Sequence, residues 1–69
     1  MKKIDLTEQE QLVLTFMANG FTRKHAAKQL NISYPKCLKI VRNIKDKFET
    51  DRIAVCIVQA FYKGYITSL

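Results

Sequence analysis

Hydrophobic residues recur at helical spacing along most of the chain, and the clearest such pattern lies in residues 33–48. Apolar side chains there return every three or four positions, at Cys37, Val41, Ile44 and Phe48. This spacing predicts a helix with one buried stripe. Ser33 suits the N-cap position, and Pro35 falls in the first turn, where its missing N–H costs nothing. At about 100° per residue, the opposite side of the helix carries Lys36, Lys39, Arg42 and Asn43.

Two shorter helices are predicted before this one. Thr7 and Glu10 have the spacing of a capping box at a helix start. The helix that follows carries one apolar face, at Leu12, Val13, Phe16 and Met17, and we expect it to stop at Asn19-Gly20. Thr22 caps a second helix that runs to Leu30. Only two residues then precede Ser33, so the second and third helices are predicted to form a helix-turn-helix with the third as the reading helix.

A fourth helix is expected from about Arg52 to Lys63, after a polar break at residues 49–51. It is apolar on nearly every side. One side carries Ile53, Cys56, Ile57 and Ala60, and a second side carries Ala54, Val58, Phe61 and Tyr65. Burial on every side is hard to arrange in so small a domain, so the second side is predicted to meet a partner and to form a dimerisation surface.

These elements predict one all-α domain over residues 1–69, with helices at roughly 7–19, 22–30, 33–48 and 52–63. A hydrophobic content of 48% with two Gly and one Pro fits a folded, mostly helical chain. No stretch approaches the roughly 20 apolar residues of a membrane span, and the N-terminus lacks the apolar core of a signal peptide. We therefore expect no membrane partner, and the use of the two cysteines, Cys37 and Cys56, fits a cytoplasmic protein.

The net charge of +6 is concentrated in the middle third of the chain. Residues 22–47 hold eight basic side chains against one acidic residue, Asp46, whereas residues 1–21 sum to −1 and residues 48–69 sum to zero. This distribution favours a surface that binds a polyanion over a basic face that only meets solvent. The third helix is basic and amphipathic, as membrane-surface helices are, but its apolar face is explained by a core.

The chain offers few groups for catalysis or metal binding. Cys37 and Cys56 fall in apolar helical stripes and are best explained as small buried hydrophobic residues. With one His in the chain, they do not make a metal-binding pattern. We find no paired carboxylates, no Gly-rich phosphate loop and no nucleophile with a suitable base. The sequence therefore predicts no enzyme, no metal and no cofactor.

In the order and spacing of its motifs, the chain resembles the LuxR/GerE-type helix-turn-helix domain of bacterial regulators. The resemblance runs without gaps from Leu6 to Ile66. It is carried by Leu6-Thr7, Glu10, Val13-Leu14, Ala18, Gly20, Thr22, Lys24, Ala27, Leu30, Ile32-Ser33, Asn43-Ile44, Lys47, Ala60 and Gly64-Tyr65-Ile66. The resemblance implies a four-helix domain that places its third helix in the major groove of DNA and pairs through its fourth. No receiver or ligand domain accompanies the four helices in this sequence, so we expect regulation through concentration, a partner or residues outside the sequence.

The reading helix departs from the family pattern. The family's usual Thr-Val-Lys-x-His becomes Lys36-Cys37-Leu38-Lys39-Ile40, so its customary Lys and His are missing. A Glu in the first helix and an Arg in the fourth become Leu12 and Ile53, an exchange of a charged pair for an apolar one. The family's usual Glu early in the second helix is His25 here, which we interpret as a surface or capping residue.

Two sets of residues are the candidates for contacting DNA. The candidates for base reading are Lys36, Lys39, Arg42 and Asn43, because Lys or Arg can pair with guanine and Asn with adenine. The alternative is that the lysines touch only phosphate. Thr22, Arg23 and Lys24 open a helix and are assigned to phosphate contact. Leu38 is either a contact to a thymine methyl group or an ordinary exposed leucine. The tyrosines at positions 34, 62 and 65 are expected in the core or an interface.

Two functions follow from these patterns. The first is sequence-specific binding of double-stranded DNA by a small bacterial transcriptional regulator that forms a weak homodimer. The second is that of a protein-binding antagonist, which pairs with another LuxR-type regulator through its fourth helix. The charge in the middle third favours DNA binding, whereas the missing Lys and His favour the antagonist.

Overall fold

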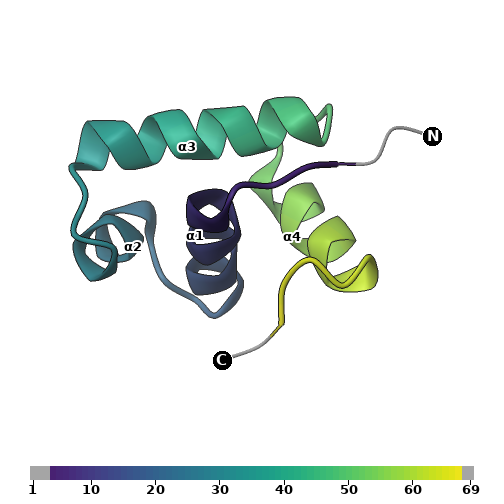
Figure 1. Cartoon of the computed structure of the whole chain (residues 1–69), viewed down its shortest axis with the longest axis horizontal. Coiled ribbons are helices and arrows are strands. Elements are labelled where there is room, and N and C mark those ends of the chain that lie inside the picture. Colours follow the sequence, from purple (N-terminus) through teal and green to yellow (C-terminus); the bar gives the residue numbers. More distant parts are fainter. Residues whose placement is uncertain (1–3, 68–69) are drawn as a thin grey trace.

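The computed structural model describes residues 4–67, and four helices with no strand account for most of them (Figure 1). The helices are α1 (Glu8–Ala18), α2 (Arg23–Gln29), α3 (Tyr34–Lys47) and α4 (Ile53–Tyr62). The predicted all-α helix-turn-helix fold is confirmed. None of the described helices is long and apolar enough to cross a membrane.

The first three helices begin at hydroxyl side chains that accept bonds from backbone amides. The side chains of Thr7, Thr22 and Ser33 accept from the amides three residues on, which otherwise have no helical partner. The capping box is complete, because the Thr7 amide also donates to Glu10 Oε1 at 2.8 Å. α4 has no such cap, since its N-cap Arg52 makes no side-chain hydrogen bond to the helix amides.

The turn between α2 and α3 contains Asn31 in the left-handed region, at φ 56°. An Asn adopts this conformation at less cost than most residues, because its short polar side chain bonds locally. The amide of Ile32 then donates to the carbonyl of Ala27 at 3.0 Å, which satisfies a carbonyl at the end of α2. Both residues therefore help to fix the angle at which α3 leaves the turn.

α3 lies along one edge of the molecule, and the other three helices lie on the same side of it (Figure 1). Its inward stripe is buried as the sequence predicts, at Cys37, Val41, Ile44 and Phe48, and it also includes Ile40. Against this stripe pack α2, through Ala26 and Ala27, and α1, through residues that are fully buried. The remaining core residues are Cys56 and Ala60 of α4, followed by Ile66. The core therefore holds α3 by one face and leaves the other face free.

The prediction for the inward face of α1 is wrong at one position. Leu12 is 40% exposed, whereas Leu14, which was not included in the predicted face, is fully buried beside Val13. Phe16 and Met17 are partly buried and pack against the core. The charged pair of the family is therefore not replaced by a buried apolar pair, because Leu12 is exposed and Ile53 is only half-buried.

An ion pair ties the end of α3 to the start of α1. Lys47 Nζ lies 2.6 Å from Glu10 Oε1 and also donates to the carbonyl of Asp5 at 2.7 Å. The Glu10 side chain is 7% exposed and that of Lys47 is 34% exposed. Glu10 thus closes the capping box and binds a cation 37 residues away in sequence. One of the eight basic side chains of residues 22–47 is therefore paired with an acid of the same chain.

We expect Glu10→Gln to lower the free energy of unfolding by about 1–2 kcal/mol, because the amide can still cap α1 but cannot form the ion pair. Lys47 is partly hydrated, so the loss stays below that of a fully buried pair. Glu8→Gln is the matched control, since Glu8 is an exposed acid in the same first turn. Urea unfolding of the three proteins measures the difference. Equal midpoints for the two variants would contradict a stabilising role of this pair.

Candidate nucleic-acid interface

The outward face of α3 brings the four predicted base-reading residues together. Lys36, Lys39, Arg42 and Asn43 are all exposed, and around the helix axis they lie on the side away from the centre of the buried stripe. An α-helix with its side chains is about 10–12 Å across, which matches the width of the DNA major groove. α3 has 14 residues and is about 21 Å long, so several successive base pairs lie within its reach.

The predicted phosphate-contact residues lie at the N-terminus of α2, next to the start of α3. Thr22 Oγ1 accepts from the amide of His25 at 3.1 Å, which leaves its hydroxyl hydrogen free to donate outward. Lys24 is exposed, and Arg23 is half-buried. The carbonyl of Arg23 accepts from Cys37 Sγ at 3.4 Å, and this bond joins the two helices of the motif. Phosphate-binding and base-reading candidates are therefore held in a fixed relation.

An open groove of about 560 Å³ runs between α2 and the beginning of α3. It is lined by Thr22, Lys24, His25, Ala27, Lys28, Ile32 and Tyr34. Lys28 and Tyr34 were not among the predicted contact residues, although both are exposed here beside Lys24. The sequence shows the charge of Lys28, but it does not show that Lys28 and Tyr34, from opposite sides of the turn, line the same groove. The groove therefore adds one cation, Lys28, and the phenol of Tyr34 to the side of the surface that carries the predicted phosphate contacts.

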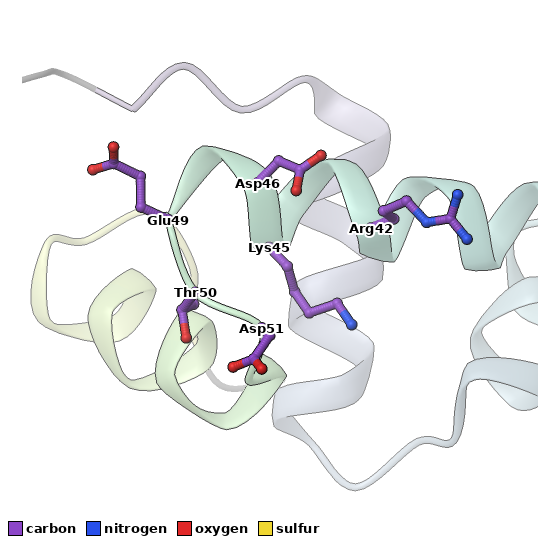
Figure 2. Close-up of a pocket in the computed structure, with 6 residues that line it drawn as sticks. All are labelled: Arg42, Lys45, Asp46, Glu49, Thr50 and Asp51. Carbon is purple, nitrogen blue, oxygen red and sulfur yellow. The ribbon is translucent and has the colours of Figure 1, made fainter.

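Acidic residues mark the other end of the basic surface. A shallow hollow of about 480 Å³ at the end of α3 is lined by Arg42, Lys45, Asp46, Glu49, Thr50 and Asp51 (Figure 2). The Arg42 guanidinium points along α3 and away from the three carboxylates (Figure 2). Within residues 4–67, no ion pair joins Arg42 to an acid. Arg42 is therefore available to a ligand, and the carboxylates beyond it repel a polyanion.

The two thiols take no part in this surface. Burial raises the pKa of the Cys37 thiol, and the nearby Arg23 charge opposes this shift only in part. Burial likewise raises the pKa of the Cys56 thiol. Both therefore stay protonated at neutral pH and act as small core residues. In the described part of the chain, no group of three His, Cys, Asp or Glu side chains is placed to hold a metal ion.

Three of the four predicted dimerisation residues are exposed on α4, and the fourth, Tyr65, is not. Ala54, Val58 and Phe61 are exposed on α4, and Val58 and Phe61 are 66% and 41% exposed. Tyr65 lies beyond the end of α4 and is half-buried, with its ring centroid 6.4 Å from that of Phe48. Tyr62 was expected in the core or an interface and is 91% exposed, next to Phe61. The exposed apolar surface of α4 therefore consists of Ala54, Val58, Phe61 and Tyr62.

A comparison with protein families matches residues 5–60 to the bacterial regulatory proteins of the luxR family. The match spans α1, α2 and α3 entirely and most of α4. The chain belongs to the luxR family. This is a family of helix-turn-helix DNA-binding regulators and not of enzymes. No curated protein sequence matches the chain.

Membership in the luxR family agrees with the geometry of the two helices of the motif. The tight α2–α3 turn and the free outer face of α3 are what a helix that enters the major groove requires. On that face Asn43 follows the family pattern, whereas Lys36, Leu38 and Lys39 depart from it.

Proposed function

We propose that this luxR-family chain is a small bacterial transcriptional regulator that binds specific double-stranded DNA sites in the cytoplasm. The observation that carries the proposal is the outward face of α3, where all four base-reading candidates are exposed and no other helix covers them. α3 enters the major groove. Lys36, Lys39 and Arg42 pair with guanine edges, and Asn43 pairs with adenine.

The contacts to phosphate come from the neighbouring helix. Thr22, Arg23 and Lys24 bind the DNA backbone beside the groove that α3 occupies, and they fix the register of the protein on the duplex. Lys28 and Tyr34 extend this contact along the open groove between α2 and α3. Asp46, Glu49 and Asp51 limit the DNA-binding surface at the other end of α3, because their charge repels phosphate.

Two copies of the chain bind one operator through α4. Large apolar side chains that are exposed next to each other on one helix favour association, and Val58, Phe61 and Tyr62 form such a surface. A dimer with a two-fold axis reads two half-sites about one helical turn apart. The surface of one short helix is small, so the dimer is weak in free solution and tightens on DNA.

The exposed surface of α4 also supports the second candidate function. The same residues can pair with α4 of another luxR-family regulator. If the mixed dimer reads DNA poorly, the chain acts as an antagonist of that regulator. The loss of the family's usual Lys from the reading helix, where this chain has Leu38, is the observation that favours this function.

A salt titration tests the contribution of the basic surface. If four to six basic groups neutralise phosphates, log affinity for a nonspecific duplex should fall with log salt concentration at a slope of about −3.6 to −5.4. Fluorescence anisotropy between low and moderate salt measures this slope. Lys63→Ala is the control, because Lys63 lies beyond α4 and outside the basic surface, and it should leave the slope unchanged. A flat response of the wild type would mean that the basic residues only meet solvent.

A further inference from the structure

We infer that Leu38 reads the methyl group of a thymine in the operator and so sets part of the sequence specificity of this chain. The inference rests on the proposed function, because it needs α3 to lie in the major groove. It assigns to the operator a thymine at one position of each half-site.

Leu38 is not one of the buried core residues. It is 39% exposed and is absent from the partly buried hydrophobic residues that pack against the core. Four other residues already form the buried face of α3, and Phe48 at its C-cap continues this face. The only other large exposed apolar side chain of this helix is Tyr34, which lines the groove beside α2. Within residues 4–67, Leu38 is therefore the one large exposed apolar side chain of α3 that does not line this groove.

The position of Leu38 places it at the edge of the base-reading face that carries Arg42. It precedes Lys39 directly and lies one turn before Arg42, about 40° away around the helix axis. Side chains four residues apart on a helix are neighbours on one face. A base pair that Arg42 reaches therefore lies beside a base pair that Leu38 meets.

The chemistry of the major groove offers one apolar partner. Among the base edges exposed there, only thymine carries a methyl group, and the other groups are hydrogen-bond donors and acceptors. A leucine against such a polar edge gains little and displaces water that the edge binds. Against a thymine methyl it buries apolar surface on both sides. Leucine is also shorter than lysine or arginine, so this contact requires α3 to lie deep in the groove.

Deoxyuridine provides a direct test, since it differs from thymidine only by the missing methyl group. A preferred site is first obtained by selection from random duplex DNA, and each thymine of that site is then replaced by deoxyuridine in turn. We expect one replacement in each half-site to weaken binding by the wild type about fourfold, the value of one buried methyl group. The remaining replacements should have little effect.

Substitutions at Leu38 assign this sensitivity to the residue. Leu38→Ala should bind the thymine and deoxyuridine duplexes with equal affinity at an unchanged melting temperature. Leu12→Ala is the matched control, because Leu12 is 40% exposed but lies on α1, and it should keep the fourfold difference. Leu38→Lys should lose the difference as well, and it should bind all duplexes more tightly with a salt slope steeper by about one.

Two outcomes would overturn this inference alone. The first is specific binding by the wild type that no deoxyuridine replacement weakens. The second is a Leu38→Ala variant that keeps the full fourfold difference, because another side chain would then read the methyl group. Failure of the wild type to bind any duplex would overturn the inference and the proposed function together.

Discussion

A variant with both Lys39→Ala and Arg42→Ala is expected to bind its preferred duplex at least about thirtyfold more weakly than the wild type. Each side chain that pairs with a base edge contributes about 1–3 kcal/mol, so the two together contribute about 2 kcal/mol or more. The two residues are three positions apart on one helix face, so their effects need not add. Binding to the selected site, measured by anisotropy at fixed salt, gives the loss.

The same variant should keep the stability of the wild type. Both side chains are exposed and lie outside the core cluster, so their removal opens no cavity and leaves no buried group unpaired. Alanine also has a high helix propensity. We therefore expect the melting temperature to stay within a few degrees of the wild-type value. Unchanged duplex binding by this double variant would contradict the proposed function.

Arg23→Ala and Lys24→Ala serve as the comparison for the double variant. Both residues are assigned to phosphate, so each change should weaken all duplexes alike and reduce the magnitude of the salt slope by about one. Lys39→Ala and Arg42→Ala should instead each relax the sequence preference at a single base pair. If the Lys39→Ala and Arg42→Ala losses were equal on every sequence, these side chains would also be phosphate contacts, and Asn43 and Leu38 would remain as the sources of specificity.

The sequence predicts the third helix well because its signals agree with one another. The apolar stripe, the Ser33 cap and the Pro35 position all favour the same helix and the same inward face. When the inward face is fixed, the outward face follows from helix geometry alone. The exposure of Lys36, Lys39, Arg42 and Asn43 in the structure is therefore a consequence of four buried residues elsewhere on the helix.

The face of α1 is less well determined by its sequence. Leu12, Val13 and Leu14 are consecutive apolar residues, so two neighbouring faces of the helix fit the pattern almost equally well. The choice between them depends on how α1 sits among three other helices. Such a choice is made by tertiary packing, which a periodicity within one helix does not contain.

Contacts between residues far apart in the sequence could not be predicted for a similar reason. Lys47 counted as one of eight basic residues in the middle third, yet it is paired with Glu10 across 37 residues of sequence. Tyr65 was placed on the α4 surface by extending helical spacing past Gly64. Gly64 has a φ of 77°, which ends the helical path and turns the chain so that Tyr65 contacts Phe48. Tyr62, at the last turn of α4, is exposed in its place.

The second large effect is expected at the α4 surface. Phe61→Glu should shift the chain to a monomer on and off DNA and should weaken operator binding about a hundredfold or more. A carboxylate placed in an apolar contact between two copies would have to lose its water without a partner. Phe61 is 41% exposed and lies outside the core, so the variant should still fold.

Sedimentation measures this effect directly. The wild-type chain of 8.0 kDa should show an average mass that rises with concentration, and two copies should bind each operator. Tyr34→Glu is the matched control for self-association in the absence of DNA, because Tyr34 is 45% exposed but belongs to α3. Identical masses for the wild type and Phe61→Glu, both free and on DNA, would exclude α4 as the contact.

The α4 variant also separates the two candidate functions when it is combined with the variant of the reading helix. A regulator needs both surfaces, so Phe61→Glu and the Lys39→Ala, Arg42→Ala double variant should each weaken specific binding to the operator by the amounts given above. An antagonist needs only α4. In that case Phe61→Glu should abolish inhibition of a second luxR-family regulator, whereas the double variant should inhibit it as strongly as the wild type. A regulator therefore loses operator binding with either variant, whereas an antagonist loses inhibition only with Phe61→Glu. A wild type that binds the operator and loses this binding with either change is the regulator.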